Sequence, residues 1–396
     1  MKNDKLNTPH VAAASIALGA VACILLVVTA LGESLERRYI HALAAILFPQ
    51  KNQGIALQRI AFGQSDLLPF YGSSELVKPA PNKAAEFYRT YPTGFDVFPV
   101  AKAGSASLIL LQKLAAVGSD LRGKKVAISL SPTWFFHKSV SAAYYNGNFS
   151  LLHAGELIYS RHLSFDLKRD IARRMLEYPE SLDKSVLAAF ALRQLASDSP
   201  LNRAMYYATV PLGLLENGIL RTQDHFLTLF YLFRESGRLH SNVRRSERGV
   251  NWDSLIAEAA SQVGVHNDLD SEPVGPEKGC EMFAANVRNA CEWIDFELLL
   301  RGLKELEARP LLLSIPIDGR YFDSYGVGRL FRDLYYKRIR ELAQAHGVPL
   351  IDFAEHDLDE DFIAGHHDHL TGKGWLYFDK ALNDFFHDRL VLQPNT

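Results

Sequence analysis

The sequence lacks the features that mark several common classes of protein. Of its 396 residues only three are cysteine, and 43 Lys and Arg nearly balance 45 Asp and Glu, for a formal charge of −2. Without a basic excess there is little to neutralise a phosphate backbone, so we exclude a nucleic-acid-binding protein. No internal repeat or low-complexity tract is present, and a composition of 48% hydrophobic and 22% charged residues predicts a globular chain.

The three cysteines carry no motif. Cys280 and Cys291 lack the C-x-x-C spacing of zinc and redox sites, and on one helix they would lie about 16 Å apart, too far for a disulfide. A bridge is possible only if Cys280 precedes the helix. We therefore interpret both as packing residues, and Cys23 as a small apolar residue within a hydrophobic helix.

One long uncharged run is present near the N-terminus, at residues 11–32. As a helix it spans a hydrocarbon core of about 30 Å, and it exceeds the apolar region of about 7–15 residues in signal peptides. We predict a retained, single-pass transmembrane anchor after a short cytoplasmic segment, 1–10. Lys and Arg on its two sides are nearly balanced, so charge alone does not decide its orientation.

The rest of the chain predicts an α/β fold. Short apolar runs that end in small or polar residues are typical of buried parallel strands, and amphipathic helical patterns lie between them. We expect a juxtamembrane segment at 33–60 and a globular domain at 61–396, with a helical insertion at about 136–280 on the carboxyl rim of the sheet. The predicted strands are 67–72, 96–101, 125–131, 311–317 and 349–354, and the predicted helices include 107–121, 285–308 and 328–347.

The first predicted strand runs into "YGSSEL", residues 71–76. A glycine permits a tight turn there, and Ser74 would lie at the carboxyl edge of the sheet beside a helix N-terminus whose N–H groups can stabilise an oxyanion. This placement suits a nucleophile. The same letters are also typical of a helix cap.

The stretch "GHHDHLTGKGW", residues 365–375, follows the last predicted strand and so belongs to the same edge. It can supply the base that a nucleophilic serine requires. It is also rich in potential zinc ligands, although adjacent residues seldom converge on one ion and no H-E-x-x-H spacing is present. The potential ligands are His356, Asp357, His366, His367, Asp368 and His369.

Four ordered blocks then resemble one family. The blocks "LPFYGSSEL", "SLSPTWF" at 129–135, "IPIDGRYFD" at 315–323 and "HLTGKGWLYFDKALNDFF" at 369–386 are similar to those of the D-alanyl transfer protein family DltD, membrane-anchored members of the SGNH or GDSL-like serine hydrolases. With the N-terminal anchor, the resemblance covers nearly the whole chain. It implies an SGNH-hydrolase-like parallel sheet flanked by helices.

The resemblance implies residue roles. Ser74 would be the nucleophile and His369 the base. The N–H groups of Ser74 and Gly104 would form the oxyanion hole, and Ser131 is a candidate third donor because this chain has "SPTWF" where SGNH enzymes supply an asparagine. Trp134, Arg320 and Tyr321 follow predicted strands and are candidate substrate-binding residues, with packing or loop bonding as the alternative.

The chain departs from SGNH enzymes three residues before the base, where His366 replaces the expected aspartate. Asp368 is our first choice for the residue that orients His369. Asp361 and Asp357 are alternatives from the preceding loop. A neutral His366 would hold the base more weakly than a carboxylate.

The implied function is a serine-dependent acyltransferase or (thio)esterase that transfers D-alanyl or a similar acyl group to a cell-envelope polymer. We expect no cofactor and no metal, and a catalytic domain outside the inner (plasma) membrane, on the periplasmic side. The implied partners are a membrane-bound O-acyltransferase of the DltB kind, an acyl donor carrier and the acceptor polymer. The alternatives are a non-catalytic binding or chaperone subunit of an O-acyltransferase complex and a metal-dependent hydrolase.

Overall fold

The fold is built on one parallel sheet, seen in a computed structural model that describes residues 8–235, 249–261, 276–364 and 369–390. Its five strands run in the order β2-β1-β3-β4-β5, and every pairing is parallel. The predicted α/β class and all five predicted strands are confirmed, with the ends shifted by a few residues. The strands are β1 (Leu67–Gly72), β2 (Asp96–Ala101), β3 (Lys125–Leu130), β4 (Arg309–Ser314) and β5 (Leu350–Ile351).

The register brings three loops to one edge of the sheet. Gly72 at the end of β1 pairs with Ala101 at the end of β2, and Leu130 at the end of β3 pairs with Ser314 at the end of β4. Since parallel strands all finish at the same side, the segments that follow β1, β2 and β3 meet there. These segments begin with the predicted site residues Ser74, Gly104 and Ser131.

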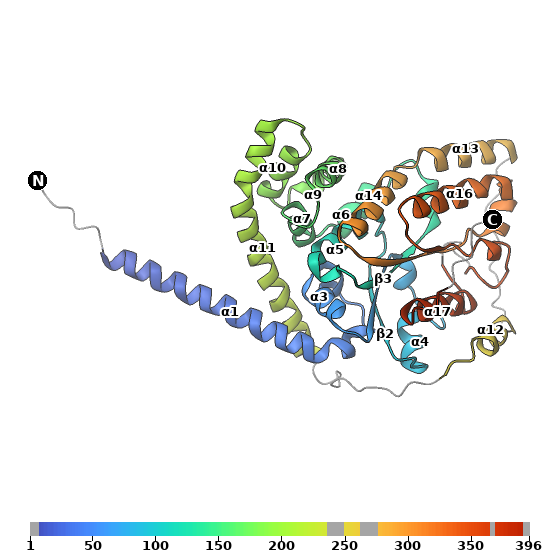
Figure 1. Cartoon of the computed structure of the whole chain (residues 1–396), viewed down its shortest axis with the longest axis horizontal. Coiled ribbons are helices and arrows are strands. Elements are labelled where there is room, and N and C mark those ends of the chain that lie inside the picture. Colours follow the sequence, from blue (N-terminus) through green and yellow to red (C-terminus); the bar gives the residue numbers. More distant parts are fainter. Residues whose placement is uncertain (1–7, 236–248, 262–275, 365–368, 391–396) are drawn as a thin grey trace, which may run out of the picture.

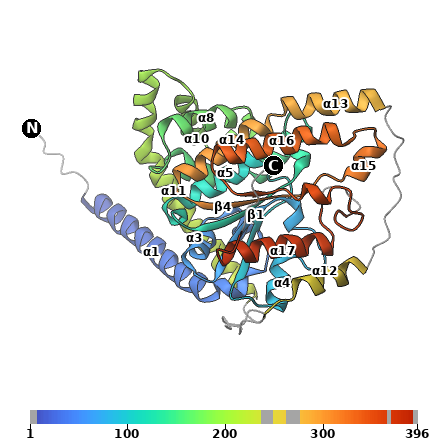
Figure 2. The same cartoon turned by 45° about the vertical axis from the view of Figure 1, so that its right-hand side comes forward.

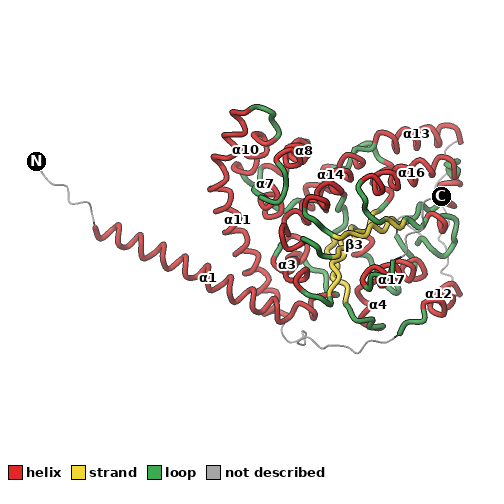
Figure 3. Tube along the Cα trace, in the orientation of Figure 1, coloured by secondary structure: helices red, strands yellow, loops and turns green. Residues whose placement is uncertain are grey.

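Helices cover both faces of the sheet (Figure 1, Figure 2, Figure 3). Buried apolar side chains form a separate core on each side, as a parallel sheet requires. One face carries α3 (Ala56–Gly63), α5 (Ser107–Val117), α14 (Glu292–Glu305) and α16 (Arg329–Ala345), and the other carries α4 (Ala84–Thr90), α12 (Trp252–Ser261) and α17 (Gly372–Phe386).

The helix predicted at 285–308 is two helices, α13 (Pro276–Asn289) and α14. The chain breaks between them where the N–H of Cys291 donates to the carbonyl of Lys138, outside the helix. Cys280 and Cys291 are both unbridged, and the Cys280 thiol donates to the carbonyl of Gly326. The cysteines are thus packing residues, as predicted.

Helices α7, α8, α10 and α11 of the insertion between β3 and β4 form a third layer, outside α5 (Figure 1). Its first part, η3 (Pro132–Phe136) and α6, lies at the carboxyl rim, where Asn148 donates to the carbonyl of Ala103 after β2. Helices α7 and α8 pack on α5 and α14, and α10 and α11 pack on α7. The insertion helices are α6 (Ala142–Asn148), α7 (Leu151–Ile158), α8 (Phe165–Met175), α9 (Pro179–Leu182), α10 (Val186–Leu195) and α11 (Pro200–Glu235).

The N-terminal run is part of one 37-residue helix, α1 (Thr8–Ala44). Among the described residues it is the one helix that is long and apolar enough to cross a membrane. Its last turns enter the domain, where Ile40 and Leu43 are fully buried, and α2 (Pro49–Gln53) continues the packing. These buried residues belong to the segment 33–60 that we predicted as juxtamembrane.

Candidate active site

A serine and a histidine from opposite ends of the chain meet at the carboxyl edge of the sheet. Ser74 Oγ lies 3.1 Å from His369 Nε2, within hydrogen-bond reach although the residues are 295 positions apart. Ser74 is half-buried and His369 is buried, with 7% of its surface exposed. A nucleophile that substrate can reach and a base that is held in place require this combination.

The turn after β1 gives its two serines different tasks. The N–H of Ser73 donates to Glu75 Oε1 over 2.8 Å, which folds the short helix η1 (Ser74–Leu76) back over the strand end. Neither serine forms a side-chain cap on η1, so the capping alternative does not account for them. Ser74 Oγ is left to face His369.

Ser73 ties this turn to the loop after β2. Its hydroxyl oxygen accepts the N–H groups of Gly104 at 3.0 Å and Ser105 at 3.1 Å. Gly104 has φ +87°, and a side chain there would lie 2.7 Å from the Tyr144 ring, so only glycine fits. The N–H that we predicted as an oxyanion donor is thus bonded to Ser73 in this arrangement.

His369 is held by the backbone on both sides. The N–H of Ala364 donates to the carbonyl of His369 at 2.8 Å, and Ile363 and Leu370 form an antiparallel bridge. Two residues later, Thr371 caps α17 by accepting the N–H of Gly374 at 3.2 Å. The helix cap and the bridge together fix where the imidazole projects.

Buried polar residues that the motifs did not reveal support the loop after β2. Ser105 Oγ donates to Asn148 Oδ1 on α6 at 3.1 Å, and Asn148 in turn donates to the carbonyl of Ala103. From α5, Lys113 Nζ donates to Asn52 at 2.5 Å and to Ser105 Oγ at 3.3 Å. Burial lowers the pKa of Lys113 to about 7.

Glu75 is a second buried group that sequence reasoning missed as a site residue. Burial raises its pKa, and the hydrogen bond from the Ser73 N–H and the charge of His369 oppose that shift. Glu75 is thus a described carboxyl group whose charge interacts with the candidate base. The only sequence signal was its position directly after Ser74.

The residue that orients His369 stays a prediction. Asp368 and His366 lie outside the described residues. Asp357 is used elsewhere, since its carboxylate lies 2.8 Å from Arg329 and 3.4 Å from Arg332. Asp361 contributes its backbone carbonyl, which accepts the Thr371 hydroxyl next to the start of α17.

A metal centre is not formed by the part of the chain that the structure describes, where no group of three or more ligand side chains gathers. His356 bonds Asp359 at 2.8 Å and stacks on Phe362, and both contacts are structural. His366, His367 and Asp368 lie outside the described residues.

Ser131, the candidate third oxyanion donor, and Trp134, a candidate substrate-binding residue, both follow β3. Ser131 bonds Thr133 and, with Ser73 and Trp134, lines a cavity of about 10 Å³, which is too small for an acyl group. The Trp134 ring packs edge-on against Tyr144, beside Gly104. The roles of Ser131 and Trp134 stay predictions.

Arg320 and Tyr321 lie on α15 (Gly319–Ser324), just after the β4 strand end. Arg320 pairs with Glu360 at 3.1 Å, in the loop that precedes His369. A hydrogen bond with Tyr325 raises the pKa of Tyr321 to about 12. Both residues thus bond within the rim loops, and their role in binding stays a prediction.

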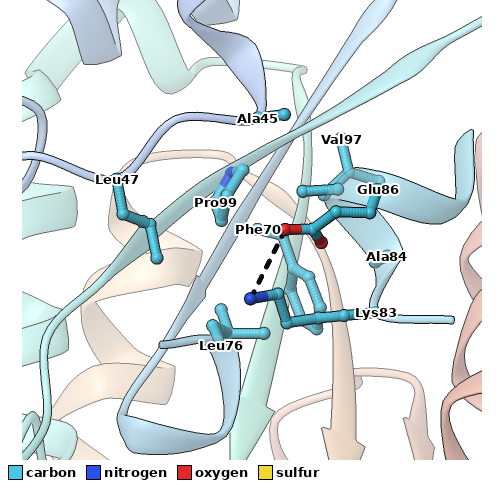
Figure 4. Close-up of a pocket in the computed structure, with 10 residues that line it drawn as sticks. Ala45, Leu47, Phe70, Leu76, Lys83, Ala84, Glu86, Val97 and Pro99 are labelled. Carbon is cyan, nitrogen blue, oxygen red and sulfur yellow. Dashed lines mark ion pairs between the residues drawn. The ribbon is translucent and has the colours of Figure 1, made fainter. Parts of the chain in front are cut away.

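A larger cavity of about 200 Å³ lies away from the pair, between α4 and the segment after α1 (Figure 4). Ala45, Leu47 and Pro99 form one side, and Lys83 and Glu86, an ion pair of 3.5 Å at the start of α4, line the other. Ser74 and His369 are absent from its lining. We therefore do not assign it to the reaction.

The fold and the site define an α/β protein with a Ser–His pair at the carboxyl edge of a parallel sheet. A family model described as "DltD protein" matches residues 45–387, which is most of the chain. The chain belongs to the DltD family.

Curated relatives agree over nearly their full length. "Protein DltD" of Bacillus subtilis (strain 168) is 27% identical over 354 residues, 87% of this chain and 88% of the relative. "Protein DltD" of Staphylococcus aureus (strain NCTC 8325 / PS 47) is 25% identical, over 85% of each chain. "Protein DltD" of Lacticaseibacillus rhamnosus is 23% identical, over 93% of this chain and 89% of the relative.

Proposed function

We propose that the protein is a membrane-anchored acyltransferase that uses Ser74 as nucleophile and His369 as base, and that it transfers D-alanyl or a similar acyl group to a cell-envelope polymer. The observation that carries the proposal is the 3.1 Å approach of Ser74 Oγ to His369 Nε2 at the strand ends. A serine within hydrogen-bond reach of a histidine, at the strand ends where open α/β sheets bind ligands, is the geometry that an activated nucleophile needs.

The first half of the reaction forms an acyl-enzyme. His369 Nε2 takes the Ser74 proton while Oγ bonds to the carbonyl carbon of an ester or thioester donor. The tetrahedral intermediate then collapses, the bond to the donor's leaving group breaks, and that group takes the proton from His369. The acyl group remains as an ester on Ser74.

The second half returns the enzyme. An acceptor hydroxyl on the polymer attacks the Ser74 ester while His369 accepts its proton, and the Oγ–carbon bond breaks as the proton passes back to Ser74. Water in place of the polymer gives hydrolysis. The same pair thus serves a transferase or an esterase, and access by water decides between them.

The oxyanion needs donors beside Ser74. The Ser74 N–H is the first, since the described part of the chain shows no acceptor for it. The Gly104 N–H becomes available when the Ser73 hydroxyl, its present acceptor, turns away. Ser131 is a third candidate, from the end of β3.

The predicted anchor supports a location of the globular domain at the membrane. Helix α1 is long enough to hold the domain at a membrane, and we assign the domain to the extracytoplasmic side. A membrane-bound O-acyltransferase would then hand over the acyl group from a carrier, and the polymer would be the final acceptor.

A second candidate is a non-catalytic subunit of such a transferase complex. It is favoured by His366, which stands three residues before His369 where the catalytic aspartate of SGNH enzymes is expected. A base without a carboxylate partner loses much of its efficiency.

Fluorophosphonate labelling of the full-length protein separates these candidates. We expect covalent modification of Ser74 that disappears in Ser74→Ala and falls strongly in His369→Ala. Ser119→Ala is the control and should retain labelling, because Ser119 is exposed in η2 (Gly118–Leu121), just before β3 begins and so at the opposite edge of the sheet. A folded wild-type protein that resists the probe would favour the binding subunit.

The metal-dependent alternative has its own test. We expect labelling and acyl transfer to be unchanged after treatment with a chelator and to need no added zinc. Activity that is lost with chelator and restored by zinc would support a metal site at the histidine-rich loop instead.

A further inference from the structure

Helix α11 has the reverse of the polarity that water demands. Its exposed side carries large apolar residues, among them Leu215 at 63%, Phe226 at 56%, Phe230 at 61% and Phe233 at 82% exposure. A helix on the surface of a soluble domain presents polar residues to solvent. The other exposed apolar residues are Leu201, Met205, Tyr207, Leu212, Leu214, Ile219 and Leu227.

The buried side of α11 is the polar one. Apart from Tyr206 and Leu232, its buried positions are small or polar, namely Thr209, Gly213, Asn217, Asp224 and Thr228. Several meet the domain at close range. A side chain at Gly213 would overlap the Tyr159 ring, and one at Gly54 would overlap Asp224. Small residues with polar contacts are typical of helix packing inside membranes.

Charge follows the same division. Between Arg203 and Arg234 the sequence of α11 contains three charged residues, and each is partnered on the protein side. Glu216 accepts from Ser185, Arg221 forms two bonds to Glu156, and Asp224 accepts the N–H groups of Ile55 and Ala56. The exposed side of the helix therefore carries no charge over this length.

Helix α11 also crosses α1 where α1 leaves its apolar run (Figure 1, Figure 2). Thr222 Oγ1 lies 3.4 Å from Thr29 Oγ1, inside that run. One turn further on, His225 Nδ1 lies 2.8 Å from Glu36, with the His225 ring against Gly32. Helix α11 therefore packs against the end of the predicted membrane span in α1, and its exposed apolar side lies next to that span.

We propose that the exposed side of α11 lies in the outer leaflet of the membrane, in contact with lipid acyl chains. The inference rests on the proposed function in one respect, the assignment of α1 as a membrane anchor. Where α1 spans the bilayer, Thr222 sits at the height of the last turn of the span. The apolar residues on either side of Thr222 then meet the hydrocarbon edge rather than water.

Lipid contact along α11 changes how the site is presented. A single helix would let the domain swivel about its anchor, whereas two crossing helices define a plane of contact. The insertion that separates β3 from β4 in the sequence would then hold the Ser74 edge in a fixed orientation to the membrane. An acceptor polymer or donor at the membrane would meet the site in one geometry.

Tryptophan fluorescence in nanodiscs of brominated phosphatidylcholine tests the proposal on the full chain. Phe226→Trp and Phe230→Trp place a reporter on the exposed side of α11 with little change of shape. We expect their added emission to be quenched about twofold or more relative to nanodiscs without bromine, as for groups in the acyl region. Leu330→Trp on α16, an exposed apolar position at 80%, is the matched control and should stay unquenched.

Leu25→Trp in α1 separates this proposal from the proposed function. If Leu25→Trp is quenched and Phe226→Trp behaves like Leu330→Trp, the lipid contact is wrong while the anchor stands. If Leu25→Trp is also unquenched, the anchor fails and the lipid contact with it. If the α11 reporters are shielded from both brominated lipid and aqueous acrylamide, a protein surface or a second copy covers the helix, and the lipid assignment is overturned.

Discussion

The sheet edge and the helical insertion solve opposite problems with polar residues. At the sheet edge, the buried polar groups of Ser73, Ser105 and Lys113 support the loops beside the half-exposed Ser74. In the insertion, α11 turns its polar groups inward and its apolar side chains outward. The difference shows that the two regions are built for different surroundings. The sheet edge faces water, and by our inference the outer side of α11 faces lipid.

The largest expected effect falls on the site alone. Ser74→Ala and His369→Ala should each lower acyl transfer by about 10⁴-fold or more, because nucleophile and base act as one unit. Thermal unfolding should stay near that of the wild type, since neither residue fills a core. If Ser74→Ala retained acyl transfer, the proposed role of the sheet edge in the reaction would be wrong.

The contact between the insertion and the helices that cover the sheet should affect the free energy of unfolding instead of activity. Arg174 on α8 forms two bonds to the buried carboxylate of Asp295 on α14, at 2.7 and 3.0 Å. Asp295→Ala removes the buried partner of Arg174 and leaves it only the more exposed Glu177, so it should cost about 3 kcal/mol in the free energy of unfolding.

The control is an exposed ion pair between Arg173, also on α8, and Asp198 in the loop after α10. Arg173 lies 2.7 Å from Asp198, whose side chain is 69% exposed. Asp198→Ala should change the free energy of unfolding by less than about 1 kcal/mol. Equal effects in denaturant titrations of the two variants would mean that the insertion is not docked through Arg174.

A smaller effect on activity is expected from the charge of Glu75. Glu75→Gln keeps an oxygen to accept the Ser73 N–H but removes the charge that interacts with His369. We expect kcat to fall by about tenfold with KM little changed, the size of a modest electrostatic contribution to the transition state. A steady-state comparison with Glu75→Ala, which also loses the hydrogen bond, separates charge from positioning.

Lys113 predicts a pH dependence of stability. Its folded pKa is about 7 against an ordinary value of 10.5, so between these pH values the unfolded chain binds the proton that the folded protein lacks. The free energy of unfolding should therefore rise with pH across this window, by at most about 1.4 kcal/mol per pH unit from this residue.

In Lys113→Met, the free energy of unfolding should rise less steeply with pH but should still rise. Lys51 is also buried with a lowered pKa and acts with the same sign. Denaturant titrations at pH 7, 8 and 9 measure the two slopes. An unchanged slope in Lys113→Met would show that the lysine is charged where it lies.

The sequence was sufficient to predict the sheet and the approach of Ser74 to His369. Short apolar runs identified the strands because parallel strands are buried on both faces, and ordered motifs brought Ser74 and His369 together. It did not reveal the Ser73–Gly104 bond or the Asn148 contact, because both depend on how α6 folds back to the sheet. The polarity of α11 was hidden as well, since polar residues on one side and apolar residues on the other average to an ordinary composition.

The central claim is that Ser74 carries the acyl group. Peptide mass spectrometry of the full-length protein, quenched in acid during turnover with a D-alanyl thioester donor, tests it directly. We predict one D-alanyl group on the peptide that contains Ser74, absent from Ser74→Ala and lost on adding the acceptor polymer. Transfer to the polymer without any acylated Ser74, and undiminished in Ser74→Ala, would contradict the account.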